Sequence, residues 1–334
     1  MGMTVDASPD AAETQLPAAP AEHRGPSLSP SRAADFKSCP LLYRFRSIDR
    51  LPEKPNVDAV RGTLVHAVLE RLFDLPAAER TPESAAALVA PRWAALREER
   101  PEVAELFAPE PAVDGPAAVG AAGPDAGDAD ADGPAAEGLT EQEFIAEAAA
   151  LLDGYFAVED PRRLEPAERE VFVEAMLGDG LLLRGIVDRL DVAPDGAIRV
   201  VDYKSGGAPR EAFEARALFQ LKFYALVLWR TRGVVPRVLR LLYLKDEEAC
   251  DYTPDGEELE RFERTLVALW EAIERATAAR DFRPKPSRLC GWCSHQALCP
   301  AYGGTPPPMW QGPGRFPERR VSSSSSRTRR SPRR

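Results

Sequence analysis

The stretch IRVVDYKSG, residues 198–206, decides how this chain folds and where its chemistry lies. It begins with β-branched apolar residues that favour a strand, and Ser-Gly-Gly breaks that strand at once. Side chains of a strand alternate between its two faces, so Asp202 and Lys204 point one way and Tyr203 points the other. A carboxylate and an ammonium group therefore lie side by side at the end of a strand. Taken alone, such a pair is most often a solvated surface ion pair, so its neighbours decide what it means.

The neighbouring segments predict an antiparallel sheet. EREVFVEAML (168–177) and LLLRGIVDRLDVA (181–193) alternate or run apolar, and Gly-Asp-Gly between them is a hairpin signal. The third strand, GAIRVVDYKSG, is entered through the turn APDG. A helix over about residues 211–232, the strand RVLRLLYLKD (237–246) and a helix over about 256–279 follow. The fold class is therefore α+β or mixed α/β, with a mixed central sheet flanked by helices.

Helical patterns fill the first half of the chain. SPSRAADFKSCPLLYRFRSI (29–48) predicts a short helix that carries Cys39. VDAVRGTLVHAVLERLFDL (57–75) has apolar residues at helical spacing, and its Gly62 and His66 lie four residues apart on one face. Further helices are predicted over residues 82–99 and 144–158.

Composition indicates one sizeable folded domain with appendages, since 44% of the 334 residues are hydrophobic and 29% are charged. No apolar run approaches the roughly 20 residues of a membrane-spanning helix, and the N-terminus has no signal-peptide pattern. We therefore predict no membrane partner and a cytoplasmic location.

The net charge of −10 is carried by one segment. Residues 101–143 hold eleven acidic residues and no lysine or arginine, and their Ala/Gly/Pro/Asp composition is typical of disorder. We predict a disordered leader over 1–27, a folded domain over 28–303 with a disordered insertion at about 108–140, and a disordered basic tail over 304–334. The tail's arginines can bind phosphates without reading sequence.

Asp188 gives the pair at Asp202 and Lys204 a chemical meaning. Asp188 lies in the second strand, and the turn before residue 198 makes the second and third strands neighbours. Mg²⁺ prefers one or two carboxylates and keeps several waters for substrate phosphates. Lys204 can then orient or deprotonate a metal-activated water. This arrangement predicts hydrolysis of phosphodiesters.

The order of motifs resembles a known family. The chain reads G-x-x-x-H (Gly62, His66), then GIVDRLD, then VDYKSG, then Q-x-x-x-Y (Gln220, Tyr224). This order resembles the RecB-type nuclease domain of the PD-(D/E)XK superfamily, from about residue 27 to 303 without the acidic insertion. Each motif alone is weak, since a lone His66 is more often a core histidine. The motif here is D-x-K rather than E-x-K, a variation that leaves the chemistry intact.

The resemblance implies a restriction-endonuclease-like core and a set of metal ligands. It implies that His66, Asp188, Asp202 and the backbone carbonyl of Tyr203 bind Mg²⁺ or Mn²⁺, and that Lys204 handles the attacking water.

Three further residues are candidates for the same site. Gln220 and Tyr224 are one helical turn apart, so both can face the site and touch the DNA strand or Lys204. Core packing is the alternative for Tyr224. Glu170, on the first strand, is a further candidate acid, with a solvated surface position as the alternative.

The cysteines form a separate pattern, C-x₂-C-x₅-C at Cys290, Cys293 and Cys299, with Cys39 far upstream. In a cytosolic chain cysteines favour metal binding over disulfides. One cysteine before the core and three after it is unusual for zinc and favours a [4Fe–4S] cluster. AddB-like RecB-family nucleases and the CRISPR-adaptation exonucleases resemble this pattern. Such a cluster would staple the N-terminal and C-terminal segments together.

Two alternatives stay open for the cysteines: a zinc site with His295 as a substitute ligand, and four buried free thiols. Cys250 has no place in the pattern.

These observations predict a metal-dependent DNA exonuclease of repair or recombination, acting on single strands or ends. The alternatives are a catalytically silent single-strand-binding module beside a helicase, and a CRISPR-adaptation nuclease. The presence of Asp188, Asp202 and Lys204 favours the enzyme. The sequence has no G-x-x-x-x-G-K-[ST] phosphate loop, so a helicase would have to be a partner.

Overall fold

A computed structural model describes residues 27–108, 139–178, 180–208 and 214–310. The predicted leader and acidic insertion lie almost entirely outside the described residues, and so do residues 311–334 of the predicted basic tail.

The core is a mixed sheet, as the sequence predicted, and six strands of the described residues form it. Its members are β1 (Ser27–Leu28), β2 (Glu168–Leu177), β3 (Leu181–Val192), β4 (Ile198–Lys204), β5 (Val238–Tyr243) and β6 (Glu248–Tyr252). The strands β2, β3 and β4 are antiparallel neighbours. β5 runs parallel to β4, because the helix α6 (Glu214–Arg232) carries the chain back between them. The predicted hairpin turns at Gly178 and Gly180, whose positive φ angles of 45° and 123° favour glycine.

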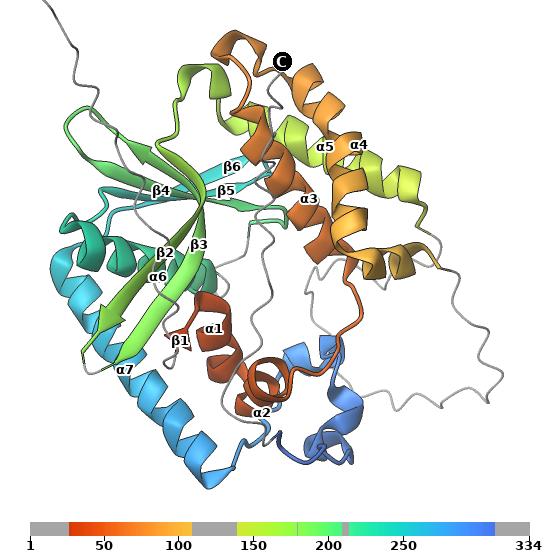
Figure 1. The fold of residues 1–334 in the computed structure, drawn as a ribbon, viewed down its shortest axis with the longest axis vertical. Helices are drawn as coiled ribbons and strands as arrows, with labels where there is room; N and C mark the ends of the chain where they lie inside the picture. The colour runs from red at the N-terminus through yellow and green to blue at the C-terminus, as the bar shows by residue number, and fades with distance from the viewer. Residues whose placement is uncertain (1–26, 109–138, 179, 209–213, 311–334) are drawn as a thin grey trace, which may run out of the picture.

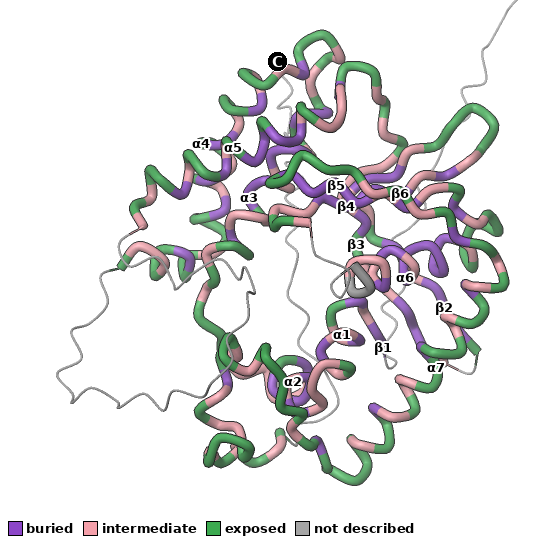
Figure 2. Tube along the Cα trace, turned by 180° about the vertical axis from the view of Figure 1, so that it is seen from behind, coloured by how far each residue is buried: buried purple, intermediate pink, exposed green. Residues whose placement is uncertain are grey.

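Helices cover both faces of the sheet (Figure 1). One face packs against α3 (Val57–Leu72), α4 (Pro82–Glu99) and α5 (Glu141–Val158), through a core that includes Val201 and Leu242 of the sheet. The other packs against α1 (Pro30–Ser38), α6 and α7 (Gly256–Ala279), through a core that includes Val200 and Leu239. Buried residues accordingly follow the central strands and α6 (Figure 2). Among the described helices, none combines the length and apolar character needed to cross a membrane.

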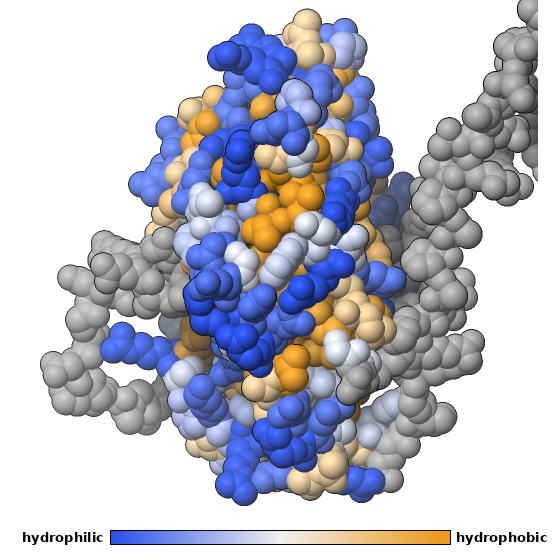
Figure 3. Space-filling model, turned by 90° about the vertical axis from the view of Figure 1, so that its left-hand side faces the viewer, coloured by the Kyte–Doolittle hydropathy of each residue, from blue (hydrophilic) through white to orange (hydrophobic). Residues whose placement is uncertain are grey.

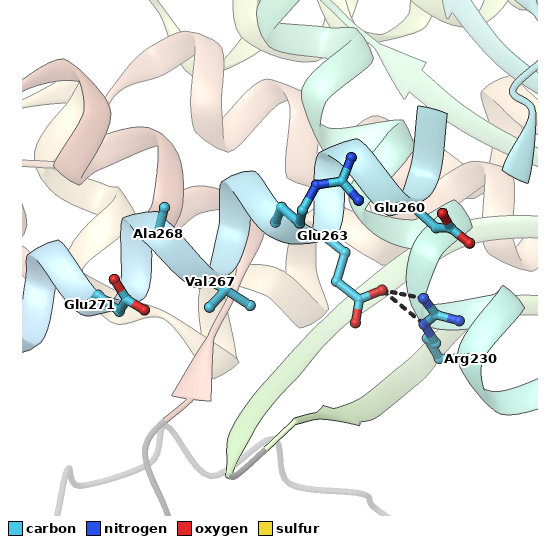
Figure 4. A pocket seen from close by; sticks show the side chains of 7 residues that line it. Arg230, Glu260, Glu263, Val267, Ala268 and Glu271 are labelled. Atoms are coloured by element: carbon cyan, nitrogen blue, oxygen red, sulfur yellow. Dashed lines mark hydrogen bonds and ion pairs between the residues drawn. The ribbon is translucent and has the colours of Figure 1, made fainter. Parts of the chain in front are cut away.

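The face of the protein that Figure 3 draws is mostly polar. Where α6 and α7 meet, Arg230 Nε donates to Glu263 Oε2 at 2.9 Å across a shallow hollow along α7 (Figure 4). Exposed apolar residues gather in part of one side of the molecule, ringed by hydrophilic ones (Figure 3).

The N-terminal and C-terminal parts of the fold lie side by side. The sequence predicts that Cys39 lies within one short helix, and this is wrong. Pro40 ends α1 and starts the short α2 (Pro40–Tyr43), so Cys39 lies at a break between two helices. A π-helical segment, Arg44–Asp49, follows. The backbone N–H of Lys285 donates to Cys39 Sγ at 3.4 Å, and Lys285 Nζ donates to the carbonyl of Lys37 at 3.0 Å.

Two strands were missed by the sequence reading. β1 has two residues and pairs with β3 through its backbone, so Ser27 belongs to the sheet and not to the leader. β6 pairs with β5 at the edge of the sheet and carries Cys250. Its residues are mostly exposed, so it lacks the apolar alternation that marks a strand.

Gly154 allows α5 to press against the chain after β5. A Cβ atom at Gly154 would lie 1.9 Å from the carbonyl oxygen of Leu244, which is backbone and has little room to move. We expect Gly154→Ala to lower the free energy of unfolding by about 1–3 kcal/mol or more, because overpacking forces backbone shifts. Thermal melting measures the change. Gly256→Ala is the control, since the nearest atoms to its Cβ lie at 3.8 Å; equal stability of the two variants would contradict the close approach.

Candidate active site

The active-site candidate lies where β3 and β4 separate. Their last ladder pair is Arg189–Val201, a register that places Asp188 opposite Asp202. The Tyr203 N–H donates to Asp188 Oδ2 at 2.8 Å. A side chain of β3 therefore takes the place of a backbone partner, and the strands open at that point.

Helix α3 brings His66 to this opening. A Cβ atom at Gly62 would lie 2.9 Å from Ser205 Oγ, so glycine lets the helix approach the end of β4. One turn later, His66 Nε2 lies 3.0 Å from the Tyr203 carbonyl oxygen, and Nδ1 lies 3.5 Å from Asp188 Oδ2. The G-x-x-x-H motif thus has a structural reason at both of its ends.

Glu170 is the third member of the group. The flanking pairs Arg169–Arg189 and Val171–Val187 place it opposite Asp188. Its φ of 43° is rare for a residue with a side chain, and such strain clusters at functional sites. Glu170 Oε1 lies 3.8 Å from His66 Nδ1. One ligand atom each from His66, Glu170 and Asp188 lie within 4.8 Å of one another, so these three residues can hold a metal ion.

Glu170 could have been placed from the sequence. Counting outward from the turn at residue 179 pairs residue 170 with residue 188, which supports the prediction of Glu170 as a candidate acid.

The electrostatics of the group fit a cation. Burial raises the pKa of Asp188 to about 7, to which Asp202 and Glu170 contribute and which His66 opposes. Burial lowers the pKa of His66, but the carboxylates of Asp188, Glu170 and Asp202 outweigh it and raise that pKa to about 9. Both shifts report closely placed negative charge. An imidazole and several carboxylate oxygens form a donor set that suits Mg²⁺ or Mn²⁺.

Asp202 and Lys204 lie beside this group rather than within it. Lys204 Nζ is 2.6 Å from Asp202 Oδ2, which is buried and has no hydrogen bond of good geometry. As the strand alternation predicted, the two side chains share a face. Asp202 Oδ2 is therefore a buried carboxylate oxygen that can bind a further group, such as a metal ion.

Gln220 and Tyr224, the two candidate residues on α6, lie next to Lys204. Lys204 Nζ donates to Gln220 Oε1 at 3.0 Å, and Gln220 Nε2 donates to the Tyr224 hydroxyl at 3.1 Å. The Tyr224 ring is buried against β3, where a Cβ atom at Gly185 would lie 2.7 Å from its Cε1. Tyr224 therefore packs in the core and also joins the polar chain that ends at Lys204.

A buried ion pair lies behind the site, and the sequence reading missed it. Arg189 is fully buried, and its Nη1 donates to Glu159 Oε2 at 2.7 Å and to the Tyr203 hydroxyl at 3.0 Å. Because Tyr203 turns its side chain away from Asp202, this contact holds the β4 backbone from the opposite face.

The cysteines form a second location. Cys39, Cys290, Cys293 and Cys299 line one pocket of about 280 Å³, although they come from opposite ends of the fold. None of the five cysteines forms a disulfide and all are only partly buried, which contradicts the alternative of four buried thiols. Cys250 lies in β6 and does not line this pocket.

The spacing of the thiols bears on which ion they hold. Among the described residues, no three cysteine sulfurs lie within 4.8 Å of one another. Zn–S bonds of about 2.3 Å in a tetrahedron place sulfurs about 3.8 Å apart. His295 also lines the pocket, but its Nε2 lies 2.9 Å from Glu53 Oε1. The arrangement is wider than a single-zinc site.

Similarity to known proteins agrees with the geometry of the first site. Residues 27–300 match the sequence profile of the PD-(D/E)XK nuclease superfamily. "Gene 69 protein" of Mycobacterium phage D29 is 27% identical over 289 residues, which cover 83% of this chain and 97% of the phage protein. "Gene 69 protein" of Mycobacterium phage L5 is 28% identical over 127 residues, or 37% of this chain and 41% of the other. A crystal structure described as "Putative exonuclease" from Eubacterium rectale covers 80% of this chain and 87% of its own, with 11% identity and a TM-score of 0.46.

Proposed function

Since the chain belongs to the PD-(D/E)XK nuclease superfamily, we propose that it is a metal-dependent DNA exonuclease of the RecB type, acting on single strands or ends in repair or recombination. The observation that carries this proposal is the group of His66, Glu170 and Asp188 within metal-binding distance of one another. The Asp202–Lys204 pair lies beside that group, at the end of β4.

We assign the metal to this group together with Asp202 and the Tyr203 carbonyl. When bound, a divalent ion polarises the phosphoryl oxygens and lowers the pKa of a bound water. Lys204 lies against Asp202 and Gln220, which fixes its ammonium at the mouth of the site. From there it can orient a water or donate a hydrogen bond to the phosphate.

Two other functions are less well supported. A catalytically silent DNA-binding module would need none of the acids, yet Glu170, Asp188 and Asp202 gather around His66 or Lys204. A CRISPR-adaptation nuclease would use the same residues, and no observation on the described residues favours it. A helicase partner and a cytoplasmic location belong to the proposal as the sequence suggested them.

The test is cleavage of end-labelled DNA by the full chain. We expect single strands to be degraded from an end with Mg²⁺ or Mn²⁺ and to survive in a chelator, because the site's acids need a cation to bring a phosphate near. Covalently closed single-stranded circles should also survive. Cutting of circles would replace the exonuclease by an endonuclease, and lack of any metal-dependent cleavage would overturn the nuclease.

The proposal includes a [4Fe–4S] cluster on Cys39, Cys290, Cys293 and Cys299. The observation that supports it is that all four thiols line one pocket. A cluster with four irons binds each thiolate to a different iron, so its thiolates lie farther apart than those around a single zinc ion.

Iron content tests the cluster. We expect anaerobically purified protein to be brown, with about four irons per chain. Because Cys39 meets the other three cysteines only in the folded state, Cys39→Ala should lose iron and lower the melting temperature together. Cys250→Ala is the matched control and should change neither. Colourless protein with one zinc would replace the cluster by zinc, and full iron in Cys39→Ala would remove Cys39 from the ligands.

A further inference from the structure

A large cleft runs alongside the candidate active site. Its volume is about 1650 Å³, above the roughly 300–1,000 Å³ of small-molecule pockets. Thr63 of α3 lines it, one helical turn before His66. Phe172 of β2 lines it too, on the same strand face as Glu170 because the two are two residues apart. The cleft therefore borders α3 and β2, which also carry His66 and Glu170 of the metal-binding group, and it has room for a polymer.

Basic residues outnumber acidic ones in the lining of the cleft. Six basic residues line it: Arg32, Arg46, Arg50, Lys54, Arg100 and Arg184. Three glutamates line it as well, Glu53, Glu102 and Glu105, and two of these pair with Arg46 and Arg100 at 2.8 and 3.1 Å. Six basic residues against three acidic ones give the lining a net positive charge, which complements a phosphate backbone.

Arg50 lines the cleft close to Arg32. It ends the π-helical segment with a φ of 52°, a left-handed conformation that arginine rarely adopts. Burial and the nearby Arg32 lower the pKa of its guanidinium, so two like charges are held close together. Arg32 and Arg50 therefore concentrate positive charge at one place in the cleft.

Two aromatic side chains stand exposed at the same cleft. Trp292 is 67% exposed and Phe172 is 52% exposed. Rings that present their faces beside a basic groove stack on unpaired bases, whereas the bases of a duplex stack on each other. Trp292 lies between Cys290 and Cys293, so the cysteine segment supplies one wall of the cleft.

We propose that this cleft binds an unpaired DNA strand, with its phosphates on the basic residues and its bases stacked on Trp292 and Phe172. This inference rests on the proposed function and adds the residues that select single strands over duplex.

Fluorescence anisotropy of a labelled single-stranded oligonucleotide, in a chelator so that nothing is cut, tests the cleft. We expect Trp292→Ala to raise the Kd for the single strand roughly tenfold, the loss of one stacked base, and Phe172→Ala to weaken it in the same direction. Trp292→Tyr keeps a ring and should recover most of the affinity. Lys54→Gln should reduce the slope of log Kd against log salt by about 0.7, because one phosphate contact is lost.

The control is Trp310→Ala, because Trp310 is also exposed but does not line the cleft. Its Kd should match that of the unmodified protein, and binding of a blunt duplex should be unaffected by Trp292→Ala. If Trp292→Ala and Phe172→Ala both fold, as melting shows, and both bind single strands as the unmodified protein does, the proposal that the cleft binds DNA is wrong. If these two variants also still cut DNA, the proposed function stands and only the role of the cleft is rejected. Protein that binds through Trp292 but never cuts would overturn the proposed function and leave the cleft intact.

Discussion

Lys204→Met and Asp202→Asn are each expected to lower the rate of DNA cleavage by a factor of about 10²–10³ or more. Lys204 Nζ lies 2.6 Å from Asp202 Oδ2 and 3.0 Å from Gln220 Oε1, so its charge is fixed in place before the substrate arrives. Fixed charges act on the transition state without reorganising, which is why removing one is costly. Asparagine keeps the shape of Asp202 but loses the negative charge that a cation needs.

Single-turnover cleavage of a labelled single strand at saturating protein measures this loss, because DNA binding does not limit the rate there. Lys222→Met is the matched control: Lys222 lies on the same helix as Gln220 but pairs with Glu258 at 2.6 Å. Its rate should stay that of the unmodified protein. If Lys204→Met and Asp202→Asn both cleave at that rate as well, the catalytic assignment is wrong.

Arg189→Met is expected to lower the free energy of unfolding by about 3 kcal/mol, because the buried Glu159 loses its nearest cation and keeps only Arg240 and Arg199, at 3.6 and 3.8 Å. Glu159 has a side chain only 7% exposed and lies 2.7 Å from Arg189 Nη1. The Tyr203 hydroxyl loses its donor in the same change. In a domain of this size each kcal/mol corresponds to about 2–4 °C in melting temperature, so the loss is readily measured.

Two further variants show whether the buried charge is the cause. Adding Glu159→Leu to Arg189→Met removes the buried carboxylate that has lost its nearest cation. The double variant should therefore recover part of the lost free energy of unfolding. Arg275→Met breaks an exposed pair with Glu271 and should change the melting temperature little. Equal melting of Arg189→Met and Arg275→Met would show that the buried pair contributes nothing.

The regular part of the fold could be predicted because its patterns are local. The alternation in β2, β3 and β4 and the helical spacing in α3 and α7 follow from periodicity, and the glycines mark the turn between β2 and β3. β1 and β6 could not be found this way: a two-residue strand has no period, and an exposed edge strand has no apolar face. Their place is set by backbone partners on β3 and β5.

The site could be predicted in part for the same reason. Asp188, Asp202 and Lys204 stand on neighbouring strands, so their proximity follows from the turn between those strands. The roles of these residues stay predictions. Arg189 in GIVDRLD reads as a solvated strand residue, and only the arrival of Glu159 from the end of α5 makes it a buried cation. The cleft was likewise not predictable, since α3, the β2–β3 hairpin and the cysteine segment meet only in three dimensions.

The side-by-side placement of the two ends of the fold also sets an order in time. Cys39 meets Lys285, which follows it by 246 residues, and His66 meets Tyr203, which follows it by 137 residues. At about 5–20 residues per second, the ribosome takes on the order of tens of seconds to supply each partner. A growing chain therefore carries α1 and α3 without the segments that complete their packing. The candidate site is therefore assembled only after residue 204 has been made, because an unfinished chain lacks the strands that carry Glu170, Asp188 and Asp202.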